Sequence, residues 1–313
     1  MKKIIIGSRG SELALWQANY VKNEIEKYHN RNGKQTVEVE ISIIQTKGDR
    51  ILDSALSSIG DKGLFTKEIE DKLFSGEIDV AVHSLKDIQT ELDERFRIAA
   101  VTARGDVEDV LIARKKDINI FDLEENAVVA TGSLRRSAQL LHLRPDIQIA
   151  ELRGNVNTRI DKFLASDWSA IILAKAGVVR LGLQKYISST IGISEMLPAA
   201  GQGALGIEIR ESDAEMQQII DPLNDDDTYA AVAAERSFLK CLNGGCQVPI
   251  GAHAVVKSTG LYLDGVVASL DGSISFRRRI RGSRTMPEKL GEDLACDMLN
   301  AGAGEVLDEI RKG

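Results

Sequence analysis

The stretch AVVATGSLRRSAQLLHL, Ala127 to Leu143, contains the unit from which the fold is built. Its first five residues are typical of a short buried strand, and the leucines and alanine that follow recur at the spacing of one helix face. IQIAELR and NVNTRIDKFLA repeat this order over residues 147–165, and SAIILA at 169–174 adds a third strand. Strands that alternate with helices form mainly parallel sheets covered on both faces. We therefore predict an α/β domain over residues 107–197.

The N-terminal third shows the same alternation. Residues 2–8 predict a buried strand, and apolar side chains recur at helical spacing from Ala14 to Tyr28, with Ser11 as the N-cap. VEVEISIIQT and IDVAVHS are typical of two further strands, and KEIEDKLFSG between them is typical of a helix. We predict a similar α/β domain over residues 1–102, completed by about residues 200–222.

Residues 225–313 have a different pattern. A helix through Cys241 precedes three strands, GAHAVV, GLYLDGVVAS and SISFRRRIRG, and the pair Asp271-Gly272 predicts a tight turn between the last two. Two helices follow, the first from Pro287 to Asn300. This order predicts a small α+β domain. The joints between the predicted domains are ARGDVED at 103–109 and LPAAGQGALG at 197–206.

The composition excludes several classes of protein. Of the 313 residues, 43% are hydrophobic and 28% are charged, which is typical of a globular protein and not of a disordered one. The net charge of -7 and an aromatic content of 4% argue against a nucleic-acid-binding protein. No apolar run is long enough for a secretory signal or a membrane span. With three cysteines and no CxxC spacing, we expect reduced thiols, a cytoplasmic location and no metal site.

Polar groups follow four of the predicted strands, in SRGS, HSLKD, TGSLRR and LRGNVNTR. Ligands of open α/β sheets bind beyond the carboxyl ends of the strands. Three of these segments place arginine beside glycine or serine before a helix, where N–H groups and the helix dipole favour an anion. Surface charges are one interpretation and an anion-binding cleft between the domains is the other, which five such arginines favour. The five are Arg9, Arg135, Arg136, Arg153 and Arg159.

The segment HSLKD supports two interpretations. Ser84 and Asp87 have the S-x-x-D spacing of a helix-capping box, which is a structural device. Alternatively His83, Lys86 and Asp87 supply a base, a cation and a carboxylate at one strand end. A carboxylate there can stabilise a cation that develops on a substrate.

The segment KCLNGGCQVPIG, Lys240 to Gly251, contains two of the three cysteines. Cys241 is interpreted as a buried structural thiol, because Phe238 and Leu239 precede it in the predicted helix. The two glycines before Cys246 allow a sharp turn that exposes its sulfur. A thiolate is favoured in a basic cleft, and it suits covalent attachment of an anionic group. The alternative is a tight loop with an incidental cysteine.

The whole chain resembles porphobilinogen deaminase, also called hydroxymethylbilane synthase. The resemblance rests on motifs in family order: SRGSELALWQA, TKGDRILD, GDKGLFTKE, DVAVHSLKD, TGSLRRSAQL, LRGNVNTR, AGVVRLGL, LPAAGQGALGIE and LNGGCQVPIG. It implies two periplasmic-binding-protein-like α/β lobes with a small α+β C-terminal domain. It also implies an enzyme that joins four porphobilinogen units head to tail, releases ammonia from each, and frees linear hydroxymethylbilane.

The resemblance also implies roles for individual residues. Cys246 would hold a dipyrromethane cofactor through a thioether, Asp87 would be the catalytic carboxylate, and Lys62 and Phe65 belong to a loop that could close over the site. The cofactor-binding residues would be Ser84, Lys86, Thr131, Ser133, Arg135, Arg136 and Arg159. The substrate-binding residues would be Arg9, Ser11, Arg153, Arg180 and Gln202. Three positions depart from the family pattern: Gln89 and Val107 replace prolines, and Gly132 replaces a serine.

The same resemblance implies a monomeric transferase of heme and chlorophyll biosynthesis whose product is used by uroporphyrinogen-III synthase. The main alternative is a solute-binding protein for an anionic ligand, because two α/β lobes with a basic cleft describe that class as well. Such a protein would have a signal peptide and no need for the third domain.

Overall fold

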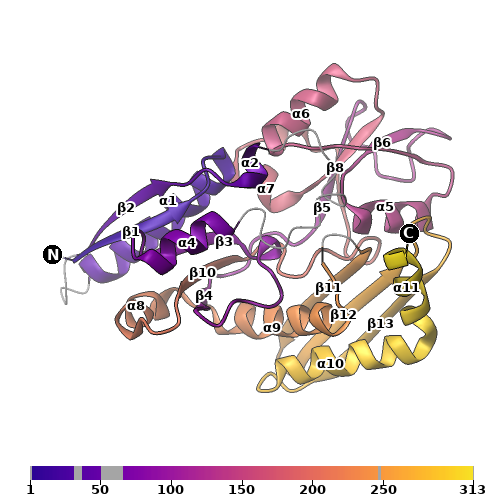
Figure 1. Cartoon of the computed structure of the whole chain (residues 1–313). Coiled ribbons are helices and arrows are strands. Elements are labelled where there is room, and N and C mark those ends of the chain that lie inside the picture. Colours follow the sequence, from indigo (N-terminus) through magenta and orange to yellow (C-terminus); the bar gives the residue numbers. More distant parts are fainter. Residues whose placement is uncertain (1, 32–36, 51–65, 246–247, 313) are drawn as a thin grey trace. The chain divides into compact units, whose positions relative to one another are not determined.

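The computed structural model describes residues 2–31, 37–50, 66–245 and 248–312 (Figure 1). The chain divides into two compact units, Met1–Gly105 with Ala204–Tyr229, and Asp106–Gly203 with Ala230–Gly313. Each unit is described by itself. The second contains both an α/β lobe and the C-terminal part, so the predicted three-domain boundaries stay a prediction.

The first unit is built on a five-stranded sheet of order β2-β1-β3-β10-β4. Strands β1 (Lys2–Ser8), β2 (Val37–Ile43) and β3 (Val80–Ser84) are parallel neighbours. Strand β10 (Leu205–Arg210) runs antiparallel between β3 and β4 (Phe96–Val101). The helices are α1 (Glu12–Arg31), α2 (Lys47–Arg50), α4 (Lys67–Ser75) and α8 (Ala214–Ile220), with 3-10 turns at Leu85–Asp87 (η1) and Asp221–Leu223 (η3).

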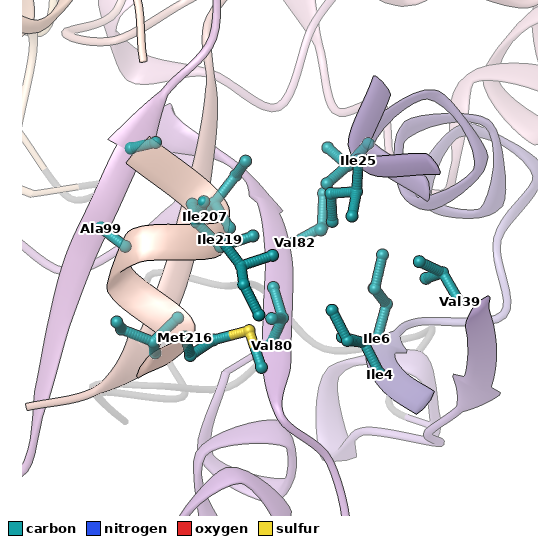
Figure 2. Close-up of a cluster of buried hydrophobic side chains, with 14 of the residues drawn as sticks. Ile4, Ile6, Ile25, Val39, Val80, Val82, Ala99, Ile207, Met216 and Ile219 are labelled. Atoms are coloured by element: carbon teal, nitrogen blue, oxygen red, sulfur yellow. The ribbon is translucent and has the colours of Figure 1, made fainter. Parts of the chain in front are cut away.

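Alternation along β3 explains how helices cover both faces of this sheet. Val80 and Val82 belong to a core cluster with Ile25 of α1 and Met216 of α8 (Figure 2). Ala81, between them, belongs to a second cluster that includes residues of α4. Successive side chains of a strand point to opposite faces, so one five-residue strand contributes to two cores.

The lobe of the second unit repeats this arrangement with the order β7-β6-β8-β5-β9. Strands β6 (Val128–Ala130), β7 (Gln148–Ala150) and β8 (Ala170–Ala174) are parallel neighbours. Strand β5 (Asp109–Ala113) runs antiparallel between β8 and β9 (Ser189–Ile191), as β10 does in the first unit. The helices are α5 (Leu134–Leu143), α6 (Val156–Ala165) and α7 (Lys175–Arg180), with a 3-10 turn at Gln184–Tyr186 (η2).

The C-terminal part is an antiparallel sheet packed on helices. Helix α9 (Asp226–Cys241) precedes β11 (Ile250–Lys257), β12 (Gly260–Ala268) and β13 (Ser275–Gly282), which pair in that order. Helix α10 (Pro287–Met298) packs against β12 and β13 (Figure 1). A π-type turn at Leu299–Ala303 (η4) leads into α11 (Gly304–Lys312). The arginine-rich strand β13 lies at an edge of this sheet.

The turn between β12 and β13 is longer than the predicted tight turn, because Ser269 N–H bonds to the carbonyl of Ile274. Gly272 has φ +72°, and a Cβ there would lie 2.4 Å from the backbone nitrogen of His142 in α5. His142 Nδ1 also lies 2.8 Å from Gly272 O. The turn therefore contacts the helix that carries Arg135 and Arg136.

The predicted fold class is confirmed, since two similar α/β lobes and a small α+β part are present. Two details of the prediction were wrong. Each lobe contains one antiparallel strand, β10 or β5, that the prediction did not include, and each begins at the end of a segment interpreted as a joint. Cys241 is exposed and not buried, because it is the last residue of α9, where the helix no longer packs around it.

Candidate active site and cofactor-binding residues

The strand ends of the first unit form one pocket. Strands β1 and β3 are adjacent and parallel, so the residues that follow them lie at the same edge of the sheet. The pocket is lined by Arg9 and Ser11 after β1, and by His83, Ser84 and Asp87 at the end of β3. Sequence analysis placed all five at strand ends, and the structure brings them together.

Ser84 does not cap a helix. The segment that follows it is the short η1 turn, and Ser84 makes no side-chain capping bond. Its Oγ instead accepts a hydrogen bond from Gln17 Nε2 of α1 at 2.7 Å. The capping-box interpretation is therefore wrong, since Ser84 connects β3 to α1 at the pocket. Ser11 does act as the N-cap of α1, because its Oγ accepts from Ala14 N–H at 3.3 Å.

Asp87 is the exposed carboxylate of this pocket. Within the described part of its own unit, its side chain makes no hydrogen bond or ion pair. Lys86 beside it is half-buried. A carboxylate at a strand end that protein groups have not already bound is able to interact with a ligand.

The second lobe presents most of the predicted arginines. Strands β7, β6 and β8 are adjacent and parallel, so their carboxyl ends lie along one edge of the sheet. The edge continues into α5, α6 and α7. Residues at these ends or in these helices are Thr131, Ser133, Arg135, Arg136, Arg153, Arg159 and Arg180.

A buried network holds Arg135 and Arg136 at the start of α5. Asp109, the first residue of β5, is fully buried and lies 2.9 Å from Arg135 Nη1 and 2.8 Å from Arg136 Nη2. Burial would raise the pKa of Asp109, but the two guanidinium charges outweigh it and hold the pKa well below its usual value. One carboxylate thus faces two cations, and a net positive charge remains.

The network also connects both segments that were predicted as joints. Gln202 Nε2 donates to Asp109 Oδ1 at 3.0 Å and to Val107 O at 2.7 Å. Arg135 Nη1 donates to Leu197 O at 2.7 Å, and Gln139 of α5 exchanges two hydrogen bonds with the backbone of Leu197. Gln202 is buried, so its amide stabilises these segments in addition to any contact with substrate.

The remaining arginines are half-buried and use part of their guanidinium groups locally. Arg153 Nε lies 2.7 Å from Glu151 Oε1, and Arg159 Nε donates to Gly154 O at 2.7 Å. Arg180 Nη2 donates to Gly203 O at 2.6 Å. The interpretation as paired surface charges therefore holds in part for Arg153, whose partner carboxylate is exposed.

The loop after β6 explains one departure from the family pattern. A Cβ at Gly132 would lie 2.6 Å from Leu152 O, so glycine allows the loops after β6 and β7 to approach closely. Thr131 is buried, and its Oγ1 accepts from Ser133 N–H at 3.3 Å. Ser133 precedes α5 without a side-chain capping bond. Its hydroxyl is therefore not used for helix capping.

Comparison with known proteins identifies the family of this chain. A model described as "Porphobilinogen deaminase, dipyromethane cofactor binding domain" matches residues 4–218, and "Porphobilinogen deaminase, C-terminal domain" matches residues 229–300. The chain belongs to the porphobilinogen deaminase family. The porphobilinogen deaminase of Chlorobium phaeobacteroides is 47% identical over 315 residues, which cover 99% of each chain. That of Lawsonia intracellularis is 47% identical over 308 residues, which cover 98% of each chain.

Among solved structures, a TRAP periplasmic solute binding protein from Desulfovibrio salexigens aligns with a TM-score of 0.42 and 11% identity over 71% of this chain and 72% of that chain. Because relatives that match nearly the whole chain are deaminases, the alternative of a solute-binding protein is rejected. The deaminase joins four porphobilinogen molecules head to tail onto a covalent dipyrromethane primer with loss of ammonia, and releases hydroxymethylbilane. The predicted family, function and cofactor are thereby confirmed.

The described residues fit a cofactor of this chemistry. Dipyrromethane bears carboxylates, and the Asp109 network leaves one uncompensated cation beside a strand end. The Nε of Arg136 is buried without a hydrogen-bond partner in the described part of its unit, which is unusual for a guanidinium that has only a structural role.

Three predicted site residues, Cys246, Lys62 and Phe65, lie outside the described residues. Among those described, no group of three His, Cys, Asp or Glu side chains is placed to hold a metal ion. No described helix is both long and apolar enough to cross a membrane.

Two groups of functional interest were not predicted as site residues. Asp109 was assigned to a joint, and nothing in VEDVLI shows that its side chain is buried between two arginines. His83 was noted in the sequence, but its partner, Glu208, was missed. Glu208 lies between Ile207 and Ile209 in the segment ALGIEI, and therefore its side chain is on the opposite face of β10 from theirs.

Proposed function

We propose that Asp87 carries the chemistry of each condensation in this deaminase. The observation that supports this most directly is its exposed carboxylate, unpaired within its own unit, in a pocket that also contains Arg9 and Ser11. Loss of ammonia from porphobilinogen leaves an azafulvenium cation, which a nearby carboxylate stabilises. The same carboxylate can accept hydrogen bonds from pyrrole N–H groups and assist proton transfer.

We further propose that the strand-end cations bind the acetate and propionate side chains of the pyrrole units. The cofactor supplies the first acceptor pyrrole when it is bound. Ser84, Lys86, Thr131, Ser133, Arg135, Arg136 and Arg159 would hold it, and Arg9, Ser11, Arg153, Arg180 and Gln202 would hold substrate units. Guanidinium groups suit this function because they bind carboxylates with two hydrogen bonds.

Cys246 is proposed as the covalent anchor, with Lys62 and Phe65 in a loop that closes over the site. The anchor is tested by intact-protein mass spectrometry under denaturing conditions, which retains only covalent ligands. The chain has matched controls, because Cys241 and Cys296 are both exposed free thiols. We expect a dipyrromethane adduct on the unmodified chain and on Cys241→Ser and Cys296→Ser, but not on Cys246→Ser. An adduct on Cys246→Ser would overturn the assignment.

The cellular setting follows from the family relationship. We propose that the enzyme is a transferase that works as a cytoplasmic monomer and that uroporphyrinogen-III synthase uses its product on the way to heme or chlorophyll. Sedimentation velocity of the cofactor-loaded protein should give a single species near 34.2 kDa. A stable dimer would contradict the monomer.

A further inference from the structure

A buried histidine and glutamate lie next to the proposed catalytic carboxylate. His83 of β3 and Glu208 of β10 are on neighbouring antiparallel strands, and His83 Nε2 lies 3.0 Å from Glu208 Oε2. Their exposed fractions are 7% and 1%. His83 also lines the pocket that contains Asp87. The pair therefore connects the interior of the first unit to the wall of the pocket.

The pair is incompletely hydrogen-bonded, which distinguishes it from a purely structural contact. Glu208 Oε1 is buried and has no hydrogen-bond partner among the described residues. Buried carboxylates with only a structural role normally have both oxygens satisfied. The hydrogen bond joins His83 Nε2 to Glu208 Oε2, and Glu208 Oε1 keeps an unused acceptor position.

Other acidic groups surround the pair. Glu70 of α4 has a raised pKa, mainly because it is buried and also because the charges of Glu208 and Asp93 lie nearby, while a hydrogen bond from Thr66 and the imidazole of His83 oppose the rise. Asp87 and the cation Arg9 line the same pocket as His83. The imidazole of His83 therefore lies near the carboxyl groups of Glu208 and Glu70 and lines the same pocket as Asp87.

The reaction requires such a proton acceptor. Porphobilinogen enters with its aminomethyl group protonated as an ammonium. In each condensation the C–N bond of this group breaks, and its electron pair leaves with ammonia. A C–C bond forms from the methylene carbon to the free α-carbon of the acceptor pyrrole. The C–H bond at that α-carbon then breaks, its electron pair returns to the ring, and a proton is released. That proton finally converts ammonia to ammonium, so no other reactant is needed.

We propose that the His83–Glu208 pair accepts the α-carbon proton in each cycle and passes it on, leaving Asp87 ionised beside the cationic substrate. This inference rests on the proposed role of Asp87 and adds to it. Asp87 alone would have to stabilise a cation and take up a proton in the same cycle. A separate acceptor keeps its negative charge available for the next cation.

The test compares isotope effects in His83→Asn and in the unmodified enzyme. Turnover of His83→Asn should fall by about 10²-fold. Porphobilinogen deuterated at its free α-carbon should give a larger kinetic isotope effect with the variant, because breaking the C–H bond then limits the rate. Added imidazole should partly restore His83→Ala. His29→Gln is the control, since His29 lies in α1 of the same unit and does not line the pocket, and its Nε2 lies 2.9 Å from Ile219 O.

Two further measurements separate the alternatives. Denaturing mass spectrometry should show the cofactor still attached to His83→Asn and Glu208→Gln, and Tm should fall by only a few degrees. In cofactor-free Cys246→Ser, the imidazole ¹⁵N resonances of His83 should move when Glu208→Gln is added, which reports the pairing without turnover. Should one variant fail to fold, the other provides the isotope measurement.

The inference is wrong if His83→Asn retains turnover within twofold. It is equally wrong if turnover falls with no change in the isotope effect and no rescue by imidazole, because the pair would then have only a structural role. Asp87→Asn, measured in parallel, distinguishes the two proposals. If Asp87→Asn retains normal turnover, the proposed role of Asp87 is wrong. If Asp87→Asn loses turnover but the His83 variants retain it, only the proposed role of the His83–Glu208 pair is wrong.

Discussion

Asp87 and Asp109 lie at the ends of strands in two similar lobes, yet their surroundings are opposite. Asp87 follows β3, is exposed, and makes no ion pair within the described part of its unit. Asp109 begins β5, is fully buried, and accepts hydrogen bonds from two arginines and one glutamine. The first is available to a ligand, whereas the second positions the arginines that are proposed to bind carboxylates. The environment of a carboxylate, and not its place in the fold, determines its role.

The difference has an energetic basis. A buried carboxylate is stable only when partners replace its hydration, so Asp109 and its two arginines depend on one another. An exposed carboxylate keeps its hydration and contributes little to stability. We expect substitutions of Asp109 to affect the fold and cofactor loading together, and substitutions of Asp87 to affect turnover alone.

The largest effect on stability should come from Asp109→Asn. Removing one partner of a buried ion pair leaves uncompensated charge, here on Arg135 and Arg136, and costs about 3–5 kcal/mol in the free energy of unfolding. Urea denaturation measures this loss. The control is Asp146→Asn, which removes a partly exposed Asp–Arg pair from the same unit, where Arg144 Nη2 lies 2.6 Å away, and should cost less. Equal losses in both variants would show that full burial of Asp109 does not increase the cost of its removal.

A smaller effect is expected from Gln202→Ala. This change removes the amide that joins Val107 O to Asp109 Oδ1, so Val107 O loses this donor while Asp109 Oδ1 keeps Arg136 Nη2. The loss should be about 1–3 kcal/mol, and it should not add fully to that of Asp109→Asn because the two side chains share one network. A double-mutant cycle measures the coupling. Full additivity would show that the joint segments do not depend on Asp109.

The smallest effect is a change with pH. Because the pKa of Asp109 is lower in the folded chain than its usual value, its contribution to stability is present above an unfolded-state pKa of about 4 and is lost as the pH falls further. The difference in unfolding free energy between the unmodified chain and Asp109→Asn should narrow below that pH, by at most about 1.4 kcal/mol per pH unit. A difference that stays constant from pH 7 to pH 3 would show that Asp109 is not an ionised partner.

Much of the fold could be predicted because its strands and helices alternate along the chain with clear hydrophobic periodicity. The strand predicted at residues 2–8 is β1, and the helix predicted before Gly76 is α4, whose last residue is Ser75. The antiparallel strands β5 and β10 were missed because each begins within a segment that was interpreted as a joint. Glycine and alanine residues around Gly201 were interpreted as a joint, although Leu205 begins a central strand.

The site, like the fold, could be predicted only in part. Residues directly after strands, such as Arg9, Ser84 and Asp87, could be placed by the rule that ligands bind at strand ends. The partners that control them could not, because Asp109 and Glu208 act through contacts across the sheet that leave no local pattern. The exposure of Asp87 and the burial of Asp109 cannot be read from the sequence, because each residue lies between one charged and one apolar neighbour.

The central claim is that Asp87 carries the chemistry while the residues that hold the cofactor are separate from it. Denaturing intact-protein mass spectrometry of Asp87→Asn, before and after a brief incubation with porphobilinogen, tests this most directly. We predict that the variant carries the covalent dipyrromethane but acquires added pyrrole units about 10²-fold or more slowly than the unmodified enzyme. A normal series of added units on Asp87→Asn would contradict the account.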